Sequence, residues 1–137
     1  MTKIYIPNVD KPAEGTPNEN HFFIIKINPE LDAIARVSPI FKCDYDNDDN
    51  MIVTSEFIGY IEFKDEDNFR AGYIAHEALH CATTFIRLFG SHSLELNPED
   101  IDDDEEYFAN IVEYFAREIT NYYWDIVKKG EYNSIFE

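Results

Sequence analysis

The chain has 137 residues, 45% of them hydrophobic, and 28 acidic against 11 basic side chains give it a formal net charge of -17. This length fits one compact domain, residues 1–137, with a core of its own. The negative charge argues against a nucleic-acid partner, because phosphate-binding surfaces need clustered positive charge. No stretch approaches the roughly 18 apolar residues of a membrane span, and the first residues lack a secretory signal. We therefore expect a cytoplasmic protein without a membrane partner.

Extended runs alternate with turn residues in the first part of the chain, which is typical of short strands. We expect strands at 3–7, 21–28, 32–44 and 51–63, the last as one bent strand or a pair, and a loop at 11–20. The run at 51–63 is rich in β-branched and aromatic residues and is bounded by acidic turns, so it is the strongest of these predictions.

Two helices are expected after the strands. The first, 68–89, has two adjoining apolar stripes, which predicts a buried helix that ends at Gly90. The second, 103–127, follows an acidic loop and is closed by Lys128, Lys129 and Gly130. Its apolar stripe consists of Phe108, Ile111, Val112, Phe115, Ile119 and Tyr122. Strands followed by helices indicate an α+β fold.

The first helix carries an H-E-x-x-H motif, His76-Glu77-Ala78-Leu79-His80. Residues four apart lie on the same face of a helix, so the two imidazoles can approach one ion. Glu77 projects about 100° round the helix and can reach a water on that ion. Zinc at such a site needs a third protein ligand and keeps a fourth position for water. The alternative is that both histidines belong to the core and bond to backbone or carboxylate groups.

The second helix supplies a further motif, because Glu106-Tyr107-Phe108-Ala109-Asn110 fits E-x-x-A-[DN]. H-E-x-x-H followed by such a helix resembles the gluzincins, the thermolysin-like zinc metallopeptidases. The chain is similar to their small single-domain members, including short phage-type zincins and small intracellular peptidases that cleave repressors. The resemblance implies a zincin-like fold, in which a small, mostly antiparallel sheet precedes a buried motif helix and a second, ligand-bearing helix.

The resemblance also assigns roles to individual residues. It implies that His76, His80 and Glu106 bind zinc and that Glu77 is the catalytic residue. It implies that Asn110, where the family more often has Asp, supports a ligand histidine. The strand before the motif helix, EFIGYIEF at 56–63, would hold an extended peptide by strand addition.

Helical periodicity points to a different third ligand. Glu106 belongs to a polar stripe nearly opposite the apolar one, whereas Glu105 sits beside Ala109, Val112 and Ala116. Periodicity therefore favours Glu105 and the family motif favours Glu106. We take Glu106 as the expected ligand and keep Glu105 as the alternative.

Other candidate sites receive ordinary structural interpretations. The two cysteines, Cys43 and Cys81, are expected to be reduced thiols, and Cys81 to be a small core residue. The segment DYDNDDN at 44–50 resembles the start of a calcium loop, but its sixth position is Asp49, where glycine is required, so we expect a hairpin turn. Three side chains could stabilise an oxyanion near the motif: His92, Tyr107 and Tyr114.

The sequence leads to one main functional hypothesis, a zinc metallopeptidase that acts on a peptide or protein substrate. A second hypothesis, motivated by the charge of -17, is an acidic binding or inhibitor protein, such as a nucleic-acid mimic, with a structural or degenerate metal site. A third keeps the zinc and changes the bond to another amide or an ester. The oligomeric state is left open.

Overall fold

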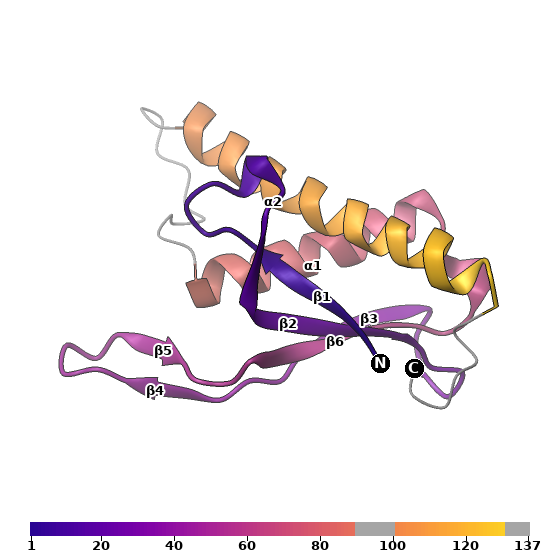
Figure 1. Ribbon diagram of the computed structural model, residues 1–137, viewed down its shortest axis with the longest axis horizontal. Coiled ribbons are helices and arrows are strands. Elements are labelled where there is room, and N and C mark those ends of the chain that lie inside the picture. Colours follow the sequence, from indigo (N-terminus) through magenta and orange to yellow (C-terminus); the bar gives the residue numbers. More distant parts are fainter. Residues whose placement is uncertain (90–100, 131–137) are drawn as a thin grey trace.

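The structure, a computed structural model, describes residues 1–89 and 101–130, without the side chains of 101–104. Gly90 and His92 therefore lie outside the described residues. The fold is α+β, with a mixed sheet and two helices (Figure 1). The strands and α-helices of the described chain are β1 (Thr2–Pro7), β2 (Pro17–Ile27), β3 (Ala35–Pro39), β4 (Cys43–Tyr45), β5 (Met51–Val53), β6 (Phe57–Phe63), α1 (Ala71–Phe89) and α2 (Ile101–Tyr122). Short 3-10 helices lie at Pro12–Glu14 and Glu66–Asn68, and a π-helical turn at Tyr123–Val127 continues α2.

The main sheet has four strands in the order β1-β2-β6-β3. The β1–β2 and β3–β6 pairs are antiparallel, while β2 and β6 are parallel, so the sheet is mixed rather than wholly antiparallel. The expectation that the strand before the motif helix holds a peptide at a free edge is wrong. β6 forms backbone hydrogen bonds with a strand on each side, and a strand paired on both sides cannot accept a third. On this side of the sheet, the edge strand is β3.

Both helices pack on the same face of the sheet and form a two-layer structure with it (Figure 1). Phe23 of β2 meets Phe115 of α2 edge to face, with ring centroids 5.7 Å apart. Tyr114 of α2 donates a hydrogen bond of 2.7 Å from its hydroxyl to the carbonyl oxygen of Tyr5 in β1. α1 contacts β3 and runs antiparallel to α2. The start of α1 is thereby placed beside the β3 edge.

The predicted apolar stripe of α2 is confirmed. Ile111, Phe115, Ile119 and Tyr122 are buried in the core, and the other two members are half-buried. α1 is less apolar on its outer side than expected, because Leu79 is 45% exposed. Both helices are therefore amphipathic. No helix among the described residues is long and apolar enough to cross a membrane.

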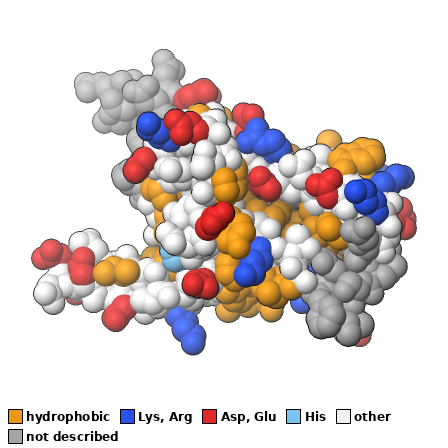
Figure 2. Space-filling view, in the orientation of Figure 1, with side chains coloured by type: hydrophobic (Ala, Val, Ile, Leu, Met, Phe, Trp, Pro, Cys, Tyr) orange, Lys and Arg blue, Asp and Glu red, His pale blue; other side chains and the backbone are white. Residues whose placement is uncertain are grey.

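The predicted hairpin turn at 44–50 is also confirmed. β4 and β5 form a separate two-stranded sheet that projects from the body of the molecule (Figure 1). The side chain of Asp46 accepts hydrogen bonds from the backbone N–H groups of Asp48 and Asn50, each at 2.9 Å. These bonds lower the pKa of the Asp46 carboxyl. Acidic side chains gather on the projecting hairpin (Figure 2).

Candidate metal centre

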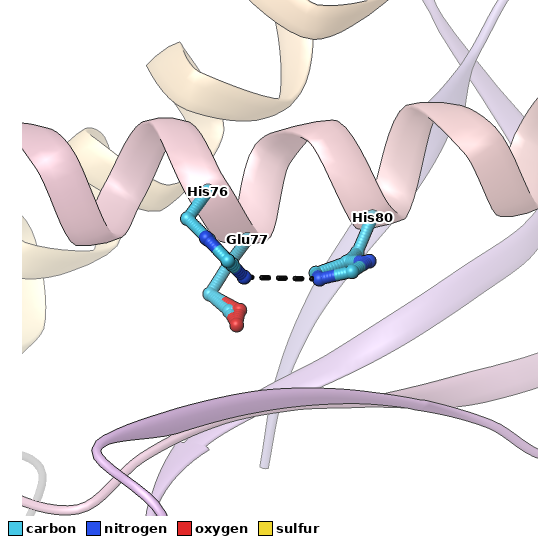
Figure 3. A group of neighbouring side chains, drawn as sticks. All are labelled: His76, Glu77 and His80. Atoms are coloured by element: carbon cyan, nitrogen blue, oxygen red, sulfur yellow. Dashed lines mark hydrogen bonds between the residues drawn. The ribbon is translucent and has the colours of Figure 1, made fainter.

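The two histidines of the motif point the same way from α1, towards the neighbouring strand layer (Figure 3). The Nε2 atoms of His76 and His80 lie 3.1 Å apart, and the ring centroids are 4.8 Å apart at an interplanar angle of 62°. Both side chains are exposed to solvent. In a neutral pair one Nε2 donates to the other, so this distance is a hydrogen bond in the absence of an ion.

The same distance fits two ligands of one metal ion. With Zn–N bonds of ~2.1 Å, two nitrogens 3.1 Å apart subtend an angle of about 95° at the ion, near the tetrahedral value. The ligand atoms of His76, Glu77 and His80 all lie within 4.8 Å of one another. Among the side chains that the structure describes, no other group of three or more histidine, cysteine or acidic residues is close enough to hold an ion.

Glu77 is the buried member of this group, with 3% of its surface exposed. Its Oε2 atom is buried and has no hydrogen-bond partner among the described residues. Burial raises the pKa of the Glu77 carboxyl, while the positive charges of His76 and His80 act in the opposite direction. A buried carboxylate oxygen without a partner is costly, so its retention points to a ligand or a reacting group at this position.

A cavity of ≈ 220 Å³ opens beside this carboxylate. It is lined by Ile34, Ala35, Tyr73, His76 and Glu77, so its walls come from the N-terminal half of α1 and the start of β3. A space of this size holds several water molecules. His76 and Glu77 therefore face a solvent-accessible hollow rather than closed core packing.

Glu106, the expected third ligand, lies elsewhere on α2. Phe85 of α1 and Phe115 of α2 face each other across the helix pair, with ring centroids 6.4 Å apart. Glu106 and His80 lie to opposite sides of that contact, and at 1.5 Å of rise per residue they are separated by on the order of 20 Å. Glu106 is exposed and is not part of the metal-ligating group. The structure thus does not support the assignment taken from the motif, because the first turns of α2 extend past the C-terminal end of α1.

The other residues of α2 considered for the site are also far from the histidines. Glu105 is exposed and precedes Glu106, so it lies still farther along α2 from the histidines. Asn110 is half-buried one turn later, on the order of 15 Å from His80 by the same helical rise, and is not brought to a histidine ring. Of the residues that the sequence nominated for a metal centre, the described structure brings together only His76, Glu77 and His80.

Other side chains considered from the sequence have structural roles. The hydroxyl groups of Tyr107 and Tyr114 donate to the carbonyl oxygens of Val9 and Tyr5, so both tyrosines tie α2 to the N-terminal segment. Cys81 is fully buried, and burial raises the pKa of its thiol well above the ordinary value. Neither cysteine is in a disulfide, as expected.

Three residues of the site were missed by sequence reasoning. Tyr73 lies three residues before His76 and four before Glu77, so helical spacing alone could have placed it beside them. Ile34 and Ala35 come from a distant strand, and their approach to α1 depends on the order of strands in the sheet.

We compared the chain with protein-family models, with curated proteins and with solved structures, and none of the three comparisons gives a match.

Proposed function

We propose that the protein is a metal-dependent hydrolase, most simply a zinc peptidase, with its centre at His76, Glu77 and His80. The observation that carries the proposal is the pair of Nε2 atoms 3.1 Å apart beside a buried, unpartnered carboxylate oxygen. Two imidazoles one turn apart and an adjacent glutamate are what zinc-assisted hydrolysis requires of a helix.

The chain's own residues have separable roles in this proposal. His76 and His80 would supply two of the ligands of zinc, and the third protein ligand is not among the described residues that lie beside them. Zinc when bound supplies a Lewis acid for the scissile carbonyl and a water of lowered pKa. Glu77 accepts a proton from the attacking water as the water oxygen adds to the carbonyl carbon. The carbon–nitrogen bond then breaks, and Glu77 passes that proton to the leaving amine. The hollow lined by Ile34 and Tyr73 provides the space for the substrate.

Metal content tests the binding half of the proposal. We expect protein purified without chelator and then supplied with zinc to hold near one ion per chain, and His80→Ala to lose it. Glu105→Ala and Glu106→Ala are matched controls, and the structure predicts that both keep the ion. Zinc retained by His80→Ala would overturn the proposed centre, whereas loss with Glu106→Ala would make that residue a ligand despite its position.

Glu77→Gln tests the catalytic half. The amide keeps the size of the side chain but cannot take a proton, so zinc should remain bound while peptide hydrolysis falls by about 10²-fold or more. The measurement is the cleavage rate of a quenched fluorescent peptide mixture by the zinc-loaded proteins. Full activity in Glu77→Gln would exclude this mechanism.

A second candidate function is an acidic binding protein. It is favoured by the charge of -17 and by the acidic hairpin that projects from the body of the molecule (Figures 1 and 2). Salt-sensitive binding to a basic protein, weakened by neutralising Asp44 and Asp48, together with no cleavage by the zinc-loaded chain, would establish it over the peptidase.

A further inference from the structure

A second hollow lies next to the cavity of the metal centre. It has a volume of ≈ 410 Å³ and is lined by Arg70, Gly72, Tyr73 and His76. Tyr73 and His76 line both spaces, so the two hollows adjoin along one side of α1. A substrate positioned over His76 would extend past Tyr73 towards Arg70.

Arg70 gives this second hollow its chemistry. It is the one side chain in the lining that carries a fixed positive charge. Its Nε donates to the backbone oxygen of Asp67 at 3.3 Å, which orients the guanidinium group. Among the described residues Arg70 makes no ion pair, so its terminal nitrogens are available to an anion.

The hollow is otherwise open and partly aromatic. A Cβ atom added at Gly72 would meet no atom within 4 Å, so nothing fills the space beside the helix there. Tyr73 is 37% exposed and belongs to the lining of both hollows. An arginine beside a tyrosine suits a planar carboxylate, which accepts two parallel hydrogen bonds from a guanidinium group.

We propose that Arg70 and Tyr73 form a carboxylate-binding subsite, so that the enzyme prefers peptides with a carboxylate group close to the scissile bond. The inference rests on the proposed function in one respect, because only a peptidase would have a scissile bond near the subsite. The binding of a carboxylate by the subsite does not depend on that function. A net charge of -17 disfavours polyanions, and a single arginine matches a single carboxylate. The carboxylate can be a peptide C-terminus or the side chain of Asp or Glu.

Peptide binding to the metal-free full-length protein tests the subsite without any need for catalysis. The probes are acetyl-Gly-Gly-Phe as the free acid, the same peptide as its C-terminal amide, and acetyl-Gly-Glu-Phe-amide. Affinities are measured by chemical-shift titration. We expect at least one carboxylate peptide to bind about tenfold more tightly than the uncharged amide, and Arg70→Ala to abolish that difference.

Matched variants separate the subsite from general charge effects. Arg87→Ala removes an exposed arginine at the other end of α1 and should leave the tenfold preference unchanged. Tyr73→Phe keeps the ring and should weaken the preference only in part. Preference for the free acid alone assigns the subsite to C-termini, and preference for the glutamyl peptide alone assigns it to acidic side chains.

The result that overturns the inference is equal binding of all three peptides, or a preference that survives Arg70→Ala. Failure of the proposed function would be detected by other measurements, namely the zinc content of the protein and the rate of peptide hydrolysis by Glu77→Gln. A carboxylate preference in a protein that binds no zinc would leave the subsite in place and remove the peptidase.

Discussion

Glu77 is held where its charge is poorly solvated. It is 3% exposed, one of its oxygens has no hydrogen-bond partner, and burial raises its pKa. The two histidines that face it lower that pKa in part, and the buried thiol of Cys81 one turn later stays protonated. In the metal-free protein this carboxylate therefore costs stability once it is ionised.

We predict that Glu77→Gln stabilises the metal-free protein at neutral pH, by about 1 kcal/mol in the free energy of unfolding. At pH 4, which is below the ordinary pKa of 4.5, the carboxyl is mostly protonated in both states and the two proteins should differ little in stability. As the pH rises towards the higher folded-state pKa, the unfolded state ionises first, so the wild type loses stability relative to Glu77→Gln. Urea unfolding at pH 4 to 8 measures this.

The control for that experiment is Glu113→Gln on α2. Glu113 is exposed and lies 3.5 Å from Arg117 in a surface ion pair, so its replacement should change stability little at any of these pH values. A Glu77→Gln protein that is less stable than the wild type at pH 7 would contradict the prediction.

At the scale of elements, the close pairing of β6 with β3 depends on a glycine. The register shifts between Phe22 and Phe23, where Phe22 pairs with Phe57 and Phe23 with Gly59. Gly59 has a φ of 156°, and a Cβ atom there would lie 2.6 Å from the carbonyl oxygen of Ser38 in β3. The irregularity lets β6 pair closely with β3 while it bulges against β2.

Gly59→Ala should therefore destabilise the fold by on the order of 3 kcal/mol, because the added methyl group meets backbone and the φ angle disfavours alanine. Gly72→Ala is the matched control. Its methyl group meets nothing within 4 Å, and alanine in a helix should add about 0.5–1 kcal/mol. We expect the urea midpoint of Gly59→Ala to lie below that of the wild type and the midpoint of Gly72→Ala to lie above it. A Gly59→Ala protein as stable as the wild type would disprove the clash.

Local patterns predicted the elements better than their arrangement. The helices at 68–89 and 103–127 and the strands at 3–7 and 21–28 follow from apolar periodicity, and the structure has helices or strands in each region. The residues Pro17–Asn20 were expected in a loop, but they form the start of β2. Their own propensity for strands is low, and they are extended because this segment pairs with the end of β1.

The same distinction applies to the site. His76, Glu77 and His80 lie within about one helical turn, so the sequence alone brings them together. Ile34 reaches them through the sheet order, and the separation of Glu106 from them results from the alignment of two antiparallel helices. The periodicity of a single segment predicts neither the approach of Ile34 to the site nor the separation of Glu106 from it.

At the scale of the whole molecule, charge is the dominant feature. With 28 acidic and 11 basic side chains, the folded chain concentrates a net charge of -17 in a small volume, and acidic groups crowd the hairpin as well as the helices (Figure 2). Self-repulsion of this kind is stronger in the compact state than in the expanded one, so it opposes folding. Surface ion pairs such as that of Arg36 with Asp32, at 2.6 Å, offset little of it.

We predict that sodium chloride stabilises the metal-free protein. Raising the salt from 20 mM to 300 mM shortens the screening length from about 20 Å to about 6 Å, which is less than the spacing of most surface charges. The expected gain is about 1 kcal/mol, or roughly 3–5 °C in Tm for a chain of this size, measured by thermal unfolding at pH 7.5 with chelator present. Choline chloride at the same ionic strength should give the same shift, because screening depends on charge and not on the identity of the cation. A lower Tm in either salt would mean that specific ion pairs outweigh the net repulsion.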